Sequence, residues 1–111
     1  MKISFAIDYI PRRMIELGFD NNYITRWRHF QLDGTSTLKI DADNEYYLLI
    51  QPSNNFLVKS KLGIYDVRDS AINEMQYEHR GKIYIYNYAT SPQLVLFIQI
   101  IPQHHLKLNA Q

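Results

Sequence analysis

The sequence contains no cysteine among its 111 residues. Disulfides, thiolate metal sites and cysteine nucleophiles are therefore excluded. An excess of one charge is also lacking, since 12 Lys and Arg residues stand against 11 Asp and Glu and give a formal net charge of +1. Because the basic residues are few and scattered, the composition argues against a nucleic-acid-binding protein that depends on phosphate neutralisation.

Glycine and long apolar runs are scarce as well. The chain has 4 glycines, and no two of them are close enough to form a phosphate-cradling loop or a nucleophile elbow. The longest apolar run, 94–98, is interrupted by Gln99 and is far shorter than the roughly 20 residues of a membrane helix. Asp8 interrupts the first apolar stretch, so we expect neither a secretory leader nor a membrane span.

The remaining composition is typical of a folded protein, with 46% hydrophobic and 14% aromatic residues. The length predicts a single domain over 1–111, in which 103–111 forms an extended tail after Pro102. Residues encoded by AT-rich codons, such as Ile, Asn, Lys and Tyr, are favoured over Gly, Ala, Arg and Pro. This bias is common in bacteriophages and many of their hosts.

Period-2 alternation and β-favouring residues dominate the chain. They predict an all-β fold, a small antiparallel β-sandwich or jelly-roll-like domain of about eight strands. Strands are expected over 2–8, 23–32, 37–42, 45–51, 56–60, 62–67 and 93–101, with tight turns at Asp33-Gly34 and 52–55. Helical structure is expected to be limited to one or two short turns. One is 11–17, with Pro11 in its first turn and Gly18 as a left-handed cap, and the other is 69–75.

A further hairpin is expected around Gly81. A three-residue loop over 79–81 gives this hairpin one consistently apolar face. It pairs Tyr77 with Ile83, and Met75 with Ile85.

The same register predicts an outward stripe of tyrosines, formed by Tyr84, Tyr86 and Tyr88. Tyrosine combines a flat apolar ring with a hydroxyl group, which suits both protein interfaces and sugar platforms. Three interpretations of the stripe remain open: packing of the rings against strand neighbours, contact with a partner protein, and stacking on a saccharide.

Two predicted strands carry apolar residues on both faces. In 93–101, Val95 and Phe97 lie opposite a second apolar set, and in 45–51 the same holds for Tyr47 and Leu49. Either another part of the chain, such as 11–18, or a curled sheet covers the second face, or that face binds another subunit. The second interpretation makes these four residues candidate interface residues.

Trp27 is flanked by Arg26 and Arg28 in the segment 23–30. As a strand, this segment places both arginines on one face and Trp27 on the other. Base stacking on the indole with phosphate contacts from the arginines is one interpretation. Because the total charge is nearly neutral, we favour a core or interface role for Trp27.

Residues with catalytic or metal-binding chemistry form no known pattern. The run from Asp41 begins like a calcium loop, but Tyr46 and Pro52 stand where such a loop needs glycine and glutamate. We interpret this run as a solvated loop. The four histidines, His29, His79, His104 and His105, match no zinc pattern. We expect no catalytic residue, no cofactor and no metal.

These observations predict a non-enzymatic structural or assembly module that contacts other protein subunits, either copies of itself or another protein. Within that class we favour a small virion component, such as a capsid-associated or connector protein of a tailed bacteriophage, assembled in the host cytoplasm. The alternative is a carbohydrate-binding module that uses the tyrosine stripe. No membrane partner is expected, and nucleic acid is disfavoured.

Overall fold

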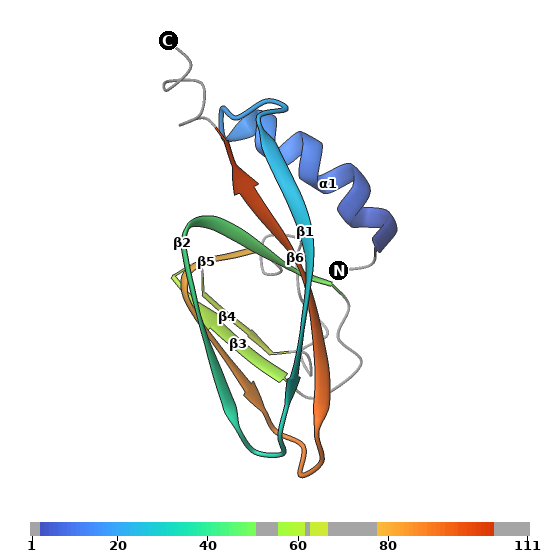
Figure 1. Ribbon diagram of the computed structural model, residues 1–111, viewed down its shortest axis with the longest axis vertical. Coiled ribbons are helices and arrows are strands. Elements are labelled where there is room, and N and C mark those ends of the chain that lie inside the picture. Colours follow the sequence, from blue (N-terminus) through green and yellow to red (C-terminus); the bar gives the residue numbers. More distant parts are fainter. Residues whose placement is uncertain (1–2, 51–55, 62, 67–77, 104–111) are drawn as a thin grey trace.

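The described part of the chain is mostly antiparallel β-sheet with one helix, which confirms the predicted all-β class. The structure is a computed structural model that describes residues 3–50, 56–61, 63–66 and 78–103. Its elements are α1 (Ile3–Glu16), β1 (Tyr23–Leu32), β2 (Thr37–Ile50), β3 (Phe56–Ser60), β4 (Gly63–Asp66), β5 (Glu78–Asn87) and β6 (Gln93–Pro102). The six strands of these residues form one sheet in the order β1-β6-β2-β5-β3-β4 (Figure 1).

The N-terminal segment is a helix of 14 residues. The strand predicted over 2–8 is therefore wrong, and the predicted turn over 11–17 is the second half of a longer helix. The alternating apolar residues that suggested a strand are exposed: Ile3, Phe5 and Ile7. The buried residues instead follow helical spacing: Ala6, Tyr9, Ile10 and Met14. Within the described residues, no helix has the length and apolarity to cross a membrane.

The end of α1 matches the prediction, because Gly18 adopts a left-handed conformation with φ 87°. The Phe19 N–H donates to the Met14 carbonyl at 2.9 Å, and the Gly18 N–H donates to the Ile15 carbonyl at 3.0 Å. These two bonds form a Schellman motif, which satisfies carbonyls that the helix leaves free. Pro11, however, lies inside the helix and not in its first turn.

The two strands predicted over 37–42 and 45–51 are one continuous strand, β2. Its pairing with β5 shifts register between Ala42 and Tyr47, and Asn44 adopts a left-handed φ of 62° in between. The bulge changes which residues of the strand point to each face of the sheet. Ile40 and Ala42 before it therefore enter the same core cluster as Tyr47 after it.

The predicted hairpin between 23–32 and 37–42 is wrong in its pairing. β6 lies between β1 and β2 and pairs with both of them. β2 pairs with β6 only over 46–50 and 96–100, and Figure 1 shows the two strands diverging beyond this region. The sheet thus folds over itself, and the β1–β2 and β5–β6 connections meet at one end of the molecule.

A buried asparagine holds these two connections together. Asn87 is fully buried, and its Nδ2 donates to the carbonyls of Asp33 at 3.0 Å, Ser91 at 3.1 Å and Leu32 at 3.3 Å. Its Oδ1 accepts a hydrogen bond from the Ala89 N–H at 2.9 Å. The side chain therefore satisfies backbone groups of both connections at once.

Glycine is required where the two connections cross. A Cβ at Gly34 would overlap the carbonyl oxygen of Thr90. The neighbouring Thr35 has a left-handed φ of 54°, and its N–H donates to the Ala89 carbonyl at 2.8 Å. The Asp33-Gly34 dipeptide thus serves this close crossing and does not close a tight hairpin.

The hairpin predicted around 79–81 is also wrong. β5 runs through Gly81, which has φ 73°, and pairs with β2 on one side and β3 on the other. The predicted partners Tyr77 and Met75 lie outside the described residues, as do the turn over 52–55, the helical turn over 69–75 and the tail from 104. The strands predicted over 56–60 and 62–67 are confirmed as the antiparallel pair β3 and β4.

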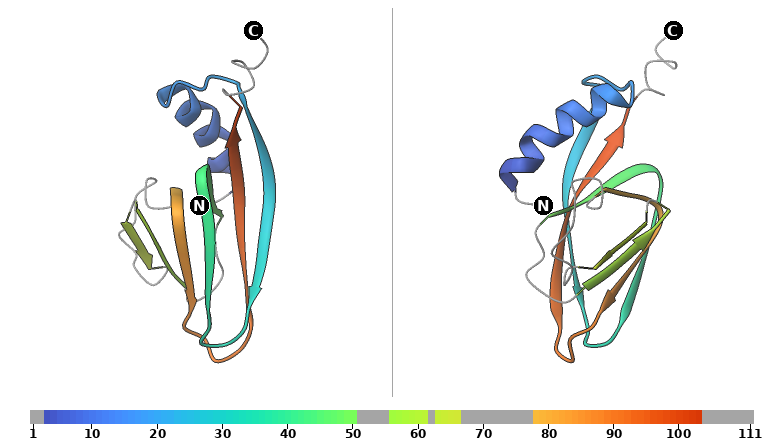
Figure 2. Two further views of the ribbon diagram at one scale, coloured as in Figure 1. Left: turned by 60° about the vertical axis from the view of Figure 1, so that its left-hand side comes forward. Right: turned by 180° about the vertical axis from the view of Figure 1, so that it is seen from behind.

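Both faces of the central strands are covered by the chain itself. On one face, the folded sheet encloses a cluster that includes Val95 and Phe97 of β6. On the other face, α1 lies across the sheet and buries a second cluster that includes Leu48 and Ile98 (Figure 2). The apolar residues that were predicted to face another subunit are therefore buried in two internal cores.

Candidate functional site

The structure separates the eight predicted interface residues into a buried and an accessible group. Four are between 0% and 3% exposed and lie in the enclosed core: Tyr47, Leu49, Val95 and Phe97. The prediction that these four form an exposed interface is wrong, because the sheet folds over them. The other four reach the surface to different extents: Trp27, Tyr84, Tyr86 and Tyr88.

The tyrosine stripe lies on the outer face of β5, where Tyr84 is 40% exposed and the other two rings are half-buried. Tyr86 and Tyr88 meet edge to face, with ring centroids 5.0 Å apart and an interplanar angle of 90°. The Lys39 Nζ lies 5.9 Å from the centroid of the Tyr84 ring. Perpendicular rings form no flat platform, so the geometry favours packing among neighbours over sugar stacking.

Trp27 lies on β1, the first strand of the sheet, and its side chain is 53% exposed. Its register partner on β6 is Ile98, and the nearby Leu94 at the start of β6 is 55% exposed. Ile24 on the same strand is 44% exposed. β1 thus combines an accessible edge with exposed apolar side chains, and Figure 2 shows it at the border of the sheet.

The opposite face of β1 carries the two arginines, as the sequence predicted. Arg28 Nη1 donates to Gln99 Oε1 at 3.2 Å and more weakly to the Tyr47 hydroxyl at 3.4 Å. Gln99 Nε2 in turn donates to Glu45 Oε2 at 2.8 Å. Arg26 pairs with Gln99 in register and is exposed. On this face, Arg26 is therefore a solvated cation, and the charge of the neighbouring Arg28 is partly compensated.

The Tyr47 hydroxyl takes part in this network from the core side. Burial raises the pKa of Tyr47, while the nearby positive charge of Arg28 lowers it and Glu45 raises it further. The phenol is therefore protonated at neutral pH, and its oxygen accepts a hydrogen bond from Arg28.

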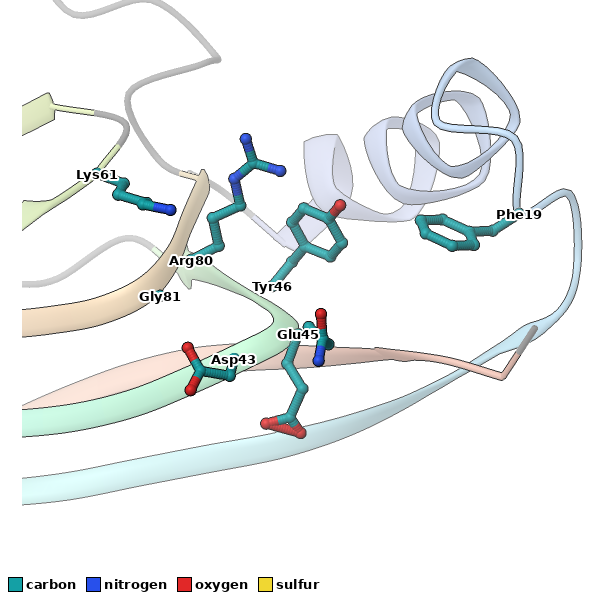
Figure 3. Close-up of a pocket in the computed structure, with 8 residues that line it drawn as sticks. Phe19, Asp43, Glu45, Tyr46, Lys61, Arg80 and Gly81 are labelled. Carbon is teal, nitrogen blue, oxygen red and sulfur yellow. The ribbon is translucent and has the colours of Figure 1, made fainter. Parts of the chain in front are cut away.

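A pocket of about 460 Å³ opens at the β2 bulge. Figure 3 shows the carboxylates of Asp43 and Glu45 on one side and the cations of Lys61 and Arg80 on the other. Its remaining wall includes Tyr46, whose ring meets Phe19 edge to face at 6.4 Å. The run interpreted as a solvated loop is thus part of a strand. Among the described residues, no three His, Asp or Glu side chains are placed to hold a metal ion.

Two polar contacts were missed by sequence analysis. Glu78, 1% exposed, binds Arg13 and Tyr9 of α1, which are more than 60 residues away in the chain. Ser60 Oγ lies 2.7 Å from Nδ1 of His79 across the β3–β5 pair. No local motif signals either contact, because each depends on which strands and helices become neighbours.

The Ser60–His79 contact resembles the pairing of nucleophile and base that covalent catalysis uses. His79 is only 1% exposed, however, and the adjacent pocket is lined by the chain neighbours Lys61 and Arg80. A substrate in the pocket would meet these two cations and not the imidazole. The contact therefore joins two strands, and neither residue lines the pocket.

Comparisons of this chain with family models, with curated proteins and with solved structures found no match.

Proposed function

We propose that this protein is a non-enzymatic module that acts through protein–protein contacts, and that the free edge of β1 is its contact surface. The observation that carries the proposal is the combination of an edge strand of 10 residues with exposed apolar side chains. In the part of the chain that the structure describes, β1 pairs only with β6 and has no strand on its outer side.

Edge strands expose unpaired backbone N–H and C=O groups, and soluble proteins usually protect them. The common protections are a short strand, a proline or a lysine on the edge. The sequence Tyr23–Leu32 contains neither proline nor lysine, and it places Trp27 and Ile24 at the surface. Arg26 and Arg28 give this edge some protection, but it is long and partly apolar, and another chain can add a strand to a surface of this kind.

The surface that supports this proposal differs from the one that the sequence suggested. The residues expected to bind a partner, such as Phe97 and Leu49, are enclosed in the core. Large apolar side chains that remain exposed lie elsewhere, on β1 and β6, on β4 at Ile64, on β5 at Tyr84 and along α1. In α1 they include Ile3 at 49%, Phe5 at 59% and Ile7 at 68% exposure. Such residues extend the accessible apolar surface beyond the edge itself.

Within this class, we propose a small virion component, such as a capsid-associated or connector protein of a tailed bacteriophage. The support is the residue bias toward AT-rich codons and a small β-sheet body suited to repeated packing in a shell. Mass spectrometry of purified particles tests this narrower proposal. Particles of the source that lack the chain would overturn it.

A saccharide-binding role is the second candidate, and the exposed ring of Tyr84 is the one observation that favours it. If the protein binds a glycan there, Tyr84→Ala abolishes retention on an affinity gel, while the conservative Tyr84→Phe keeps it. A wild-type protein that no glycan retains would exclude this candidate.

The contact proposal is tested by placing a photoreactive amino acid at position 27 in cells that make the protein. We expect covalent adducts with a partner chain at this position. Thr37, an exposed residue at the start of β2, is the matched control position and should give far fewer adducts. A chain that stays monomeric by light scattering at high micromolar concentration and forms no adduct at position 27 would overturn the proposal.

A further inference from the structure

The edge of β1 also specifies the chemistry of its partner. Building on the proposed contact function, we propose that β1 accepts an extended segment of another protein as an added strand, with apolar residues on one face of that segment and acidic residues on the other. Two independent features of β1 carry this inference: backbone groups that no described strand pairs with, and the position of Trp27 on one face with Arg26 and Arg28 on the other.

The backbone supplies the attachment. In an antiparallel ladder, alternate residues direct both N–H and C=O toward the same side. A strand of 10 residues paired on one side therefore leaves about five N–H and five C=O groups for an added strand. These groups bind any extended segment, so the main chain gives affinity while the side chains give specificity.

The first face of β1 is polar at Thr25 and Gln31 and selects an apolar residue at Trp27. Trp27 and His29 lie on this face, beside Ile98 and Leu96 of β6 in the register. The indole is 53% exposed, and Leu94 at the end of the same face is 55% exposed. Cross-strand neighbours on one face lie close enough for their side chains to interact. An added strand would therefore cover Trp27 best with an aliphatic or aromatic residue.

The second face selects acidic residues. Arg26 and Arg28 lie two positions apart on this face, between the apolar residues Ile24 and Phe30, and Tyr23–Leu32 contains no carboxylate. Arg28 is half-buried and linked through Gln99 to Glu45, so its charge is partly compensated within the chain. Arg26 is exposed and provides the main unused charge. Opposite charges on neighbouring strands stabilise the pairing, whereas like charges directly opposite destabilise it.

The same charges disfavour a second copy of this chain as the partner. Two antiparallel β1 strands related by a twofold axis perpendicular to the sheet pair residues that lie on the same face. In the register centred on Trp27, Arg26 of each copy lies opposite Arg28 of the other. Shifting the centre by one residue in either direction would place one arginine directly opposite its own copy. In these three registers an acidic strand removes the repulsion between arginines, so a heterologous partner fits the edge better there.

Trp27 is the only tryptophan of the chain and reports directly on this edge. The experiment titrates the full-length protein with a peptide of ten residues in which valine alternates with glutamate and which contains no tryptophan. We expect a saturable shift of the indole emission to shorter wavelength, because the added strand removes water from the ring. A valine–lysine peptide of the same pattern should give no shift.

Two controls separate strand addition from simple charge attraction. The valine–glutamate peptide with all its backbone amides N-methylated keeps the charges but has no N–H groups to donate to the carbonyls of β1, and it should bind far more weakly. Arg26→Glu should weaken the peptide affinity about tenfold. Lys59→Glu, which makes the same charge change at an exposed residue of β3, should leave the affinity unchanged.

Several results would overturn the inference. These are no spectral shift with the acidic peptide, equal binding of the lysine or N-methylated peptide, and equal effects of Arg26→Glu and Lys59→Glu. A shift that grows with protein concentration alone would show that a second copy occupies the edge. If adducts form at position 27 while the acidic peptide fails to bind, the contact function stands and this partner chemistry is wrong. If the peptide binds but the chain stays monomeric and forms no adduct in cells, the edge can accept a strand and the contact function in cells is wrong instead.

Discussion

The guanidinium of Arg13 donates two hydrogen bonds to the carboxylate of Glu78, from Nε at 2.9 Å and from Nη2 at 3.2 Å, and so joins α1 to β5. The Tyr9 hydroxyl donates a third bond to the same carboxylate at 2.7 Å. This pairing raises the pKa of Arg13 above its ordinary range. Because Glu78 is only 1% exposed, its charge depends on these partners, and they fix how α1 lies across the sheet.

We expect Arg13→Met to lower the free energy of unfolding by about 3 kcal/mol, because it leaves a buried carboxylate with the tyrosine as its main partner. The double variant Arg13→Met, Glu78→Leu should recover most of that loss, since it removes the buried charge itself. Urea denaturation measures both values. Glu16→Gln is the control, because it removes only an exposed contact to Arg13 at 3.2 Å and should cost less than about 0.5 kcal/mol. Equal losses for Arg13→Met and Glu16→Gln would contradict the assignment.

The hydrogen bonds by which Asn87 holds the two connections together give a second prediction. Asn87→Asp keeps the shape of the side chain but replaces the Nδ2 donor by an oxygen that faces three backbone carbonyls. We expect a loss of about 3 kcal/mol in the free energy of unfolding, since the buried carbonyls lose a donor and face a negative charge. Hydrogen exchange should also become faster at the Thr35 amide, which bonds to the connection that Asn87 holds.

The comparison for this prediction is Gln93→Glu, which makes the same change of amide to carboxylate at a residue whose Nε2 donates to Ser91 in an exposed contact. It should change the free energy of unfolding by less than about 0.5 kcal/mol. An Asn87→Asp variant as stable as Gln93→Glu would show that the two connections are held by other contacts.

The raised pKa of Tyr47 predicts how stability depends on alkaline pH. The unfolded phenol titrates near 10.0, and burial raises the pKa in the folded state above that value. Below pH 10 both states are protonated and the full stability is present. As the pH rises past the unfolded pKa, the unfolded state loses its proton first, so stability falls by at most about 1.4 kcal/mol per pH unit from this group.

Tyr47→Phe removes this contribution, so the variant should lose less stability than the wild type between pH 9.5 and 11, as denaturant midpoints at each pH would measure. Tyr84→Phe removes a hydroxyl from an exposed ring and serves as the matched control. Parallel pH curves for the wild type and Tyr47→Phe would show that burial of this phenol does not govern the alkaline loss.

Local patterns predicted the elements whose surroundings are simple. The end of β1 follows from the turn-forming Asp33-Gly34 after it, and the left-handed Gly18 follows from glycine at a helix end. The segment of α1 carries two periods at once, the alternation of Ile3, Phe5 and Ile7 and a weaker helical spacing. Whether the segment forms a strand or a helix depends on whether a face of the sheet must be covered, and this is a property of the whole fold.

Pairing between distant strands left no local signal. Trp27 aligns with Ile98, far along the chain, and this pairing inserts β6 between β1 and β2. The arginines of β1 were placed correctly on one face, because alternation alone decides that. The exposure of the edge could not be read from the sequence, since it depends on strand order, and the same unknown order led to the wrong interface at Phe97.

The sequence placed Trp27 and Phe97 in the same predicted interface. Because the structure exposes Trp27 and buries Phe97, substitutions at the two positions should have different effects on stability. Phe97 is fully buried, with its ring 5.6 Å from Tyr47 and 6.4 Å from Phe30, centroid to centroid. We expect Phe97→Ala to lower the free energy of unfolding by about 3 to 5 kcal/mol, because a large cavity opens in the enclosed core.

Trp27→Ala should cost less than about 1 kcal/mol, since the indole is 53% exposed and its removal opens no cavity. Leu94→Ala, at a residue 55% exposed on the same face, is the matched control and should behave in the same way. Guanidinium denaturation followed by circular dichroism measures all three variants without relying on the lost indole. Similar losses at positions 27 and 97 would mean that Trp27 belongs to a core, and the β1 edge would then no longer offer the apolar surface on which its contact role depends.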